Sequence, residues 1–165
     1  MQKSKLILSA LLISLILFTG IVVAEEKSAF QLGVEKYNQG DYQGAVEYLV
    51  EAVAKNPDSM RRHYLLGLSY YRLGNYDFAQ TQFEKAHQIE PNNYKVLVNL
   101  GRTYYQQNKF DQAIKRAEQA LAKNKNRPDA YALVGRVYGA QGKFDNAINN
   151  FKQAIKIDKN NYYYL

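Results

Sequence analysis

Apolar residues recur at helical spacing in the segment Met60–Asn93, and the rest of the chain repeats its pattern. One apolar and aromatic run extends from Tyr64 to Leu73, and a second extends from Tyr76 to Ile89. Both have the spacing of an amphipathic helix. A Gly-Asn pair separates the two runs, which is typical of a turn, and Pro91 follows the second run. The segment therefore predicts two helices joined by a short turn.

The same pattern recurs at a spacing of 34 residues without gaps, in units 26–59, 60–93, 94–127 and 128–161. The eighth position of every unit is Gly and the twentieth is Ala, so two helices can cross closely there. Aromatic residues at the eleventh and seventeenth positions fill the remaining space. A single helix pair cannot bury its apolar face alone, whereas stacked pairs form a continuous core. We predict an all-α fold, an α-solenoid of four stacked antiparallel helix pairs behind an N-terminal apolar signal helix. The fifteenth position is expected to end each first helix in the left-handed conformation, at Gly40, Gly74, Asn108 and Gly142.

The 34-residue period and the LGLSYY block at Leu66–Tyr71 resemble the tetratricopeptide repeat family over residues 26–161. Two positions depart from the family pattern. The bulky fourth residue is replaced by Ala29 and His63 in the first two units, and the large residue at position twenty-four is Ala117 in the third. We expect Ala29 to reflect the N-terminal edge of the array. At Ala117 we expect looser packing or compensation by a neighbouring side chain.

Residues 1–24 have the pattern of a signal peptide or an N-terminal anchor. Lys3 and Lys5 precede an uncharged apolar run from Leu6 to Val23, and small residues end at Ala24 before the polar chain begins. The run of 18 residues is also long enough to span a bilayer if it is not cleaved. In both cases we expect export. Cleavage after Ala24 would make the chain periplasmic or extracytoplasmic, and an intact leader would anchor it to the inner membrane by its N-terminus.

At the other end, residues 162–165 fall on positions one to four of a further unit. We expect them to be the start of a truncated fifth repeat. The alternative is an end that stacks against another molecule, because solenoids normally finish with a polar capping element.

Composition excludes several classes of chemistry. The chain has no Cys, which removes disulfides, thiolate metal sites and cysteine nucleophiles. No nucleophile elbow or glycine-rich phosphate loop is present, and the glycines follow the repeat. His63 and His87 are expected near the same end of one helix pair, but further metal ligands are missing. We therefore expect no enzymatic activity, no cofactor, no metal and no small-molecule substrate.

The resemblance implies that the first helix of each unit lines a concave face that binds extended peptides. Positions five, nine, twelve and thirteen of the unit then point inward. They predict an aromatic ladder over the first three units, with arginines toward the C-terminal half. A purely structural interpretation, in which the tyrosines pack between units, stays open. The predicted partner-binding groove consists of Phe30, Tyr37, Asn38, Tyr64, Leu68, Tyr71, Arg72, Arg102, Tyr105 and Arg136.

The charge distribution agrees with a basic groove. The net charge of the chain is +7, and without Lys3 and Lys5 it is +5, with 20 basic and 15 acidic residues. The first-helix segments carry eight basic residues against three acidic ones, again +5, so all other mature positions balance. Arginine and tyrosine are the residues most often found as binding anchors. The excess positive charge therefore lies on the helices that are expected to face a partner.

These features predict a non-enzymatic, exported scaffold for protein–protein interaction. It would bind an extended peptide or partner segment of acidic or aromatic-rich character and support assembly of a cell-envelope complex. The main alternative is a membrane-tethered or self-associating structural array that assembles through its C-terminal edge. Nucleic-acid binding is a third hypothesis, suggested by basic charge and aromatic residues, but export and the modest net charge argue against it.

Overall fold

The computed structural model describes residues 27–159, which form eight α-helices and no strand. The predicted signal helix and the residues 162–165 lie outside this described part of the chain. Within residues 27–159, no helix has the length and apolar character needed to cross a bilayer. The helices are α2 (Ala29–Asn38), α3 (Tyr42–Lys55), α4 (Met60–Arg72), α5 (Tyr76–Ile89), α6 (Tyr94–Gln106), α7 (Phe110–Lys123), α8 (Pro128–Ala140) and α9 (Phe144–Ile157).

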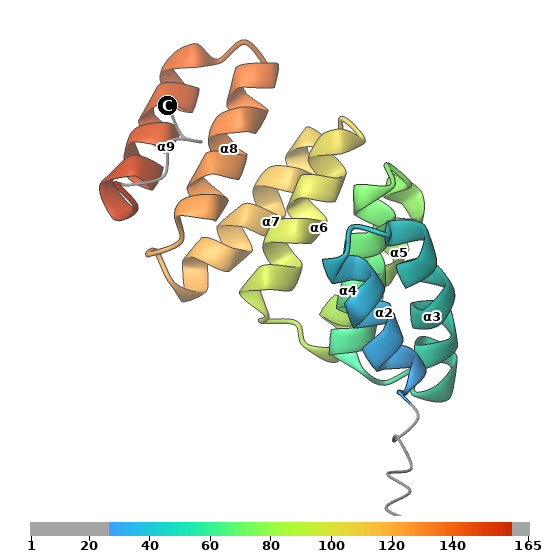
Figure 1. Cartoon of the computed structure of the whole chain (residues 1–165). Coiled ribbons are helices and arrows are strands. Elements are labelled where there is room, and N and C mark those ends of the chain that lie inside the picture. Colours follow the sequence, from blue (N-terminus) through green and yellow to red (C-terminus); the bar gives the residue numbers. More distant parts are fainter. Residues whose placement is uncertain (1–26, 160–165) are drawn as a thin grey trace, which may run out of the picture.

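The helices pack as four consecutive pairs, α2–α3, α4–α5, α6–α7 and α8–α9, and each pair stacks on the next (Figure 1). The second helix of each pair contacts the first helix of the following pair, as α3 does with α4. The first helices α2, α4, α6 and α8 also contact one another in succession, whereas the described second helices make no extended contacts of that kind. Because the first helices approach more closely, they lie on the inner side of the curved array. The predicted all-α solenoid is confirmed.

The turn inside each pair depends on one residue with a left-handed backbone. Gly40, Gly74 and Gly142 have φ of 81°, 78° and 74°, and Asn108 has φ of 59°. A side chain with a Cβ is strained in this conformation, except that Asn tolerates it. The residue that follows donates its backbone N–H back into the last turn, as Asn75 does to Tyr70 at 2.9 Å. This confirms the predicted ends of the first helices.

Glycine at the eighth position lets the two helices of a pair approach closely. A Cβ on Gly67 would lie 2.9 Å from ring carbons of Phe83, which is fully buried. In the third pair, where Ala117 replaces the large residue, a Cβ on Gly101 would instead lie 2.8 Å from Cδ2 of Leu133 in α8. Leu133 from the next pair thus fills the space that Ala117 leaves, so the expected compensation by a neighbour is confirmed.

The core is continuous through the later pairs and smaller at the N-terminal end. Its principal cluster runs from Ala79 in α5 to Val137 in α8, and a second cluster lies between α3 and α4. The alanines at positions twenty and twenty-seven are almost fully buried in every pair, which allows the helices to pack at short range. The described pairs are thus held by two clusters, the larger of which extends over α4 to α8.

Candidate partner-binding face

All ten residues of the predicted groove lie on the first helices, which form the inner side of the array. Six of them are half-buried and pack against the two core clusters through part of their surface. Arg72, Arg136 and Asn38 are exposed, and Arg102 is half-buried. The half-buried members in contact with the core are Phe30, Tyr37, Tyr64, Leu68, Tyr71 and Tyr105.

The predicted aromatic ladder consists of ring pairs within each unit. Tyr71 meets the Tyr76 ring edge-on at a centroid distance of 5.4 Å. The equivalent pairs in the first and third units have centroid distances of 5.4 Å and 6.1 Å. In the fourth unit Gly139 stands at this position, so Phe144 has no ring partner and is 68% exposed. The ladder therefore covers three units and ends at α8, as predicted from the sequence.

Two tyrosine hydroxyls link consecutive first helices. The side-chain amide of Asn99 donates to the Tyr64 hydroxyl at 3.0 Å, and the amide of Gln106 donates to the Tyr71 hydroxyl at 3.3 Å. Both bonds connect residues 35 positions apart, so they join the same faces of α4 and α6. The Tyr64 ring also lies 5.8 Å from the Phe83 ring. These tyrosines thus hold the array together and still present part of their rings on its inner side.

Tyr64 lies where several first helices come together. Burial raises the pKa of its hydroxyl, and charged or polar groups of α2, α6 and α8 act on it as well. Among these groups are Tyr37 of α2, Arg102 of α6 and Asp129 of α8. Tyr64 is thus half-buried between α4 and α6, where Asn99 donates to its hydroxyl.

The arginines of the predicted groove differ in how they are held. A hydrogen bond to the Tyr37 hydroxyl raises the pKa of Arg72, and the same guanidinium lies 6.0 Å from the centroid of the Tyr42 ring. Arg102 donates to Asn99 at the long distance of 3.5 Å. Arg136 makes no ion pair or hydrogen bond with a described residue. The structure thus brings Arg72 together with Tyr37, and it leaves the other two guanidinium groups available.

The structure adds a pocket that the sequence did not predict. A hollow of about 460 Å³ opens between the N-terminal ends of α4 and α6, with Tyr64 in its wall. Its two cations, Arg61 and Lys95, are exposed and occupy the same position in consecutive units. Neither forms an ion pair with a described residue. The pocket is lined by Met60, Arg61, Tyr64, Asn92, Asn93, Tyr94 and Lys95.

Neighbouring side chains hold the walls of this pocket in place. The guanidinium of Arg127 stacks on the Tyr94 ring, with 3.5 Å between its carbon and the ring centroid. The side chain of Asn93 caps α6 by accepting from the backbone N–H of Lys95 at 3.1 Å. The signal that could have found the pocket was the recurrence of a basic residue at the second position of the first three units, Lys27, Arg61 and Lys95.

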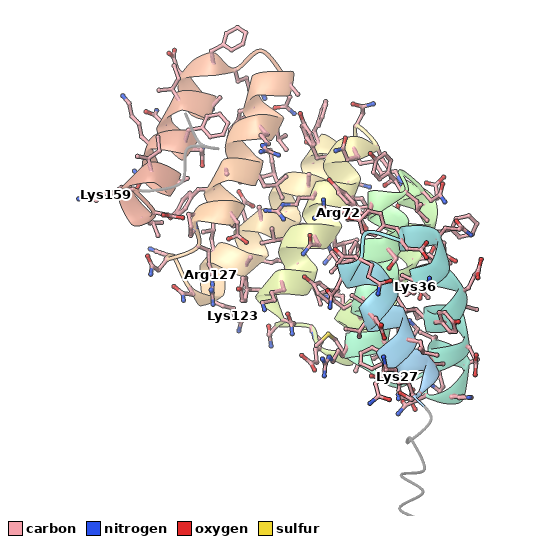
Figure 2. All side chains as sticks on the ribbon, in the orientation of Figure 1. Lys27, Lys36, Arg72, Lys123, Arg127 and Lys159 are labelled. Atoms are coloured by element: carbon pink, nitrogen blue, oxygen red, sulfur yellow. The ribbon has the colours of Figure 1, made fainter. Side chains whose placement is uncertain are left out.

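Ion pairs are concentrated at the N-terminal end of the array. The three ion pairs that the structure gives all lie within residues 27–55 and join Lys27 to Glu35, Lys36 to Asp41 and Lys55 to Glu51. Figure 2 shows the labelled Lys27 and Lys36 along α2 at this end, and Lys123 and Arg127 together at the α7–α8 connection. The cations of the inner face beyond α3 thus have no carboxylate partner among the described residues.

Each histidine has a partner of its own. His63 is buried, and its ring nitrogens lie 2.8 Å from the Gln82 side chain and 2.8 Å from the backbone oxygen of Pro57. The ring of His87 meets the Arg116 guanidinium at 3.2 Å, and burial followed by this positive charge lowers its pKa. Among residues 27–159, no cluster of three His, Cys, Asp or Glu side chains could hold a metal ion. The histidines thus belong to the packing of the helix pairs.

Comparison with solved structures places the chain beside MamA. A crystal structure of MamA is 25% identical and superposes with a TM-score of 0.72, covering 78% of this chain and 75% of that one. The MamA D159K mutant is 28% identical with a TM-score of 0.68, over 79% and 76% of the two chains. MamA from Desulfovibrio magneticus RS-1, at 21% identity and a TM-score of 0.74, covers 82% and 77% and shows the shared fold alone. No curated protein matches the chain in sequence.

Models of protein families, compared with the sequence, identify the same kind of repeat that the fold shows. Three models, each described as a tetratricopeptide repeat, match residues 30–93, 74–137 and 128–161. Together they cover the chain from residue 30 to residue 161, which includes nearly all of the eight helices that the structure describes. The repeat pattern, the stacked helix pairs and these matches agree, and the chain is a member of the tetratricopeptide repeat family.

Proposed function

We propose that this chain is a non-enzymatic scaffold that binds an extended segment of a partner protein along its first helices. One observation carries the proposal. Two cations without a carboxylate partner, Arg61 and Lys95, lie beside the half-buried Tyr64 and Tyr94 around a pocket of about 460 Å³. The fold and the family of the chain, both of which serve protein interaction, support the same function. The rigid helix pairs hold the anchors at fixed spacing, so binding a partner orders few groups on this side.

The chemistry of the face favours an acidic partner segment that also carries aromatic side chains. Arg61, Lys95 and Arg136 have no carboxylate partner among the described residues, so a partner carboxylate would meet them without breaking an existing ion pair. Charge-assisted hydrogen bonds of this kind are stronger than neutral ones. The exposed parts of the Tyr37 and Tyr71 rings offer surfaces for aromatic stacking. An extended segment can reach both sets of anchors because they recur along successive repeats.

We further propose that the scaffold works outside the cytoplasm and supports assembly of a cell-envelope complex. The leader in residues 1–24 supports this proposal, because its order of charge, apolar run and small residues is that of a signal peptide. Cleavage after Ala24 would free the repeats, whereas an intact run of residues 6–23 would tether them to the membrane. N-terminal sequencing of the chain from the native envelope fraction distinguishes the two, and recovery from the cytoplasm alone would contradict export.

Partner capture tests the binding face. The repeats are immobilised, incubated with the native envelope fraction, and the retained proteins are identified by mass spectrometry. The double variant Tyr71→Ala with Arg102→Ala should lose the captured partner while keeping its helical circular dichroism. Each anchor is expected to contribute about 1–2 kcal/mol, so the loss should be at least tenfold in affinity. Equal capture by this variant and the wild type would refute the proposed face.

A defined probe separates charge from shape. A labelled peptide of alternating Glu and Tyr should bind the wild type, and a peptide of alternating Lys and Tyr should not. Replacing Arg61 and Lys95 by Ala should weaken binding of the acidic peptide and reduce its dependence on salt. The matched control replaces Lys85 and Lys115, which are exposed on the second helices, and should bind as the wild type does. An equal effect of both double variants would show that only net charge matters.

A further inference from the structure

The positive charge of the described chain is concentrated at one edge of the array, which we call the basic edge. This edge contains the helix ends where one pair connects to the next, in residues 27–30, 52–64, 86–98, 120–132 and 154–159. It carries ten basic residues against four acidic ones, a net charge of +6. The opposite edge contains the turns inside the pairs, in residues 36–46, 70–80, 104–114 and 138–148. It carries four basic and four acidic residues, so the excess charge belongs to one edge alone.

The connection between α7 and α8 is the most basic part of this edge. Lys123, Lys125 and Arg127 lie within five consecutive residues. Lys123 and Lys125 are exposed, and neither forms an ion pair with a described residue. Figure 2 shows Lys123 and Arg127 along the same edge as Lys27 and Lys159. The cations are therefore spread along the length of the array and are not confined to one pair.

Lysine predominates among the exposed cations of the basic edge, which are Lys27, Lys55, Arg61, Lys95, Lys123, Lys125, Lys156 and Lys159. An ammonium group is a hydrated point charge on a flexible stem, whereas a guanidinium suits a partner held in fixed bidentate geometry. Among the described residues of this edge, only Ile89 is an exposed large apolar side chain, at 38%. The edge therefore suits an extended surface of mobile anionic groups, which it would attract by charge without inserting into it.

The predicted leader joins the array at this same edge. Lys27 lies on the basic edge just before α2, and the apolar run of residues 6–23 precedes it in the sequence, outside the described residues. Residues 24–26 connect the two, so the end of the apolar run and Lys27 are at most about 14 Å apart. This limit is less than twice the Debye length of about 8 Å at physiological ionic strength. A leader held in a bilayer would therefore keep the basic edge, and not the opposite edge, close to the lipid headgroups.

A nucleic acid fits the basic edge less well than a lipid surface does. Single strands bind by stacking their bases on open aromatic rings as well as by charge. The Tyr94 ring, beside the connection between α7 and α8, is already covered by the guanidinium of Arg127 at 3.5 Å. The charge of this edge is thus offered without a stacking surface next to it.

We propose that the basic edge docks on the surface of a bilayer that contains anionic lipids. The helices run from one edge of the array to the other, so their axes would stand steeply on the membrane and the first-helix face would stay open to the side. The inference goes beyond the proposed peptide binding and shares with it only the leader of residues 1–24. Arg61 and Lys95 of the pocket belong to this edge, so a bound partner segment would lie close to the membrane. Lys123 and Lys125 lie outside the pocket and the predicted groove, and they allow an independent test.

Co-sedimentation with lipid vesicles tests the docking. Residues 25–165 are used, because both core clusters lie within the described helix pairs and the apolar leader would bind lipid by itself. This chain should bind vesicles of equal parts phosphatidylglycerol and phosphatidylcholine, it should not bind phosphatidylcholine alone, and added salt should release it. Each basic residue near an anionic surface strengthens binding about fivefold, so replacing Lys123 and Lys125 by Ala should weaken it at least tenfold. Circular dichroism should be unchanged.

A matched control separates the edge from the net charge. Replacing Lys115 and Lys143 by Ala removes the same charge from exposed positions outside the basic edge, and this variant should bind as the wild type does. Equal weakening by both double variants, or a wild type that ignores anionic vesicles, would overturn the proposal. Binding of an RNA oligonucleotide or of polyglutamate through Lys123 and Lys125, without binding of vesicles, would assign the edge to a macromolecular partner and also overturn it. None of these outcomes affects the proposed capture of an acidic peptide, which is tested at other residues.

A single fluorescent label tests the orientation. The chain has no Cys, so Asn126→Cys places one label on the basic edge, and Asn146→Cys places one in the first turn of α9 at the opposite edge. Both asparagines are exposed. Energy transfer to labelled lipid headgroups should be strong from residue 126 and weak from residue 146 when the chain is bound to anionic vesicles. Equal transfer from the two positions would refute docking by the basic edge.

Discussion

Gly67 and Gly139 provide a matched test of how the helix pairs hold together. Both glycines lie inside a first helix, α4 and α8 respectively. A Cβ on Gly67 would lie 2.9 Å from two ring carbons of Phe83, and a Cβ on Gly139 would meet only the Cβ of Ala147, at 4.0 Å. The substitutions Gly67→Ala and Gly139→Ala therefore add the same methyl group to a filled space and to an open one.

The two substitutions should change the free energy of unfolding in opposite directions. Alanine in place of glycine inside a helix ordinarily stabilises it by about 1 kcal/mol. A methyl group forced into a filled core costs about 1–3 kcal/mol. Phe83 is fully buried and packs on the Tyr64 ring, so it has little room to move. We expect Gly67→Ala to destabilise the array by about 1 kcal/mol, and Gly139→Ala, near a helix end, to stabilise it by about 0.5 kcal/mol.

Urea denaturation followed by circular dichroism measures both effects. The urea concentration at the midpoint should fall for Gly67→Ala. In thermal unfolding followed by the same signal, the melting temperature should fall by about 4 °C for a domain of this size. In the background of Phe83→Ala, which removes the ring, the added methyl group should no longer destabilise. A Gly67→Ala variant as stable as the wild type, or one whose cost persists without the Phe83 ring, would refute the packing argument.

Three further predictions concern the turns, the stacked pocket wall and pH. Gly74→Ala should lower the free energy of unfolding by about 1–2 kcal/mol because φ is 78° at this residue, and an unchanged urea midpoint would contradict the strain. Arg127→Ala should lower the free energy of unfolding by about 1–2 kcal/mol, because it uncovers the Tyr94 ring. A cost no larger than that of replacing an exposed lysine by alanine would argue against the stacking. Burial and then Arg116 lower the pKa of His87, with Glu84 opposing them, so its contribution to stability is complete above about pH 6.5 and is lost as pH falls through the folded pKa. His87→Gln should therefore flatten the fall in melting temperature below that pH, and an unchanged slope would exclude His87 as its cause.

The partner-binding face was only partly visible in the sequence. Repeat positions placed Tyr64 and Tyr71 on the first helices, and the ladder of rings ends at Gly139 as the residue types predict. The hydrogen bonds from Asn99 and Gln106 that give those tyrosines a second, structural task depend on how α4 and α6 are placed side by side. Such contacts between units cannot be read from one unit. The pocket escaped prediction for the same reason, because two helix ends must meet to form it.

The sequence by itself determined the helix pairs, their turns and the order of stacking. These features depend on local chemistry that repeats every 34 residues: Gly or Asn where φ is positive, and small residues where two helices cross. Tertiary structure decided what each equivalent position faces. Leu133 fills the space beside Ala117, Arg127 covers Tyr94, and the hydroxyls of Tyr64 and Tyr71 accept from side chains of α6. The physical reason is that equivalent residues differ in burial only through their neighbours in the stack, and the neighbours at each end of the array are unlike those in its middle.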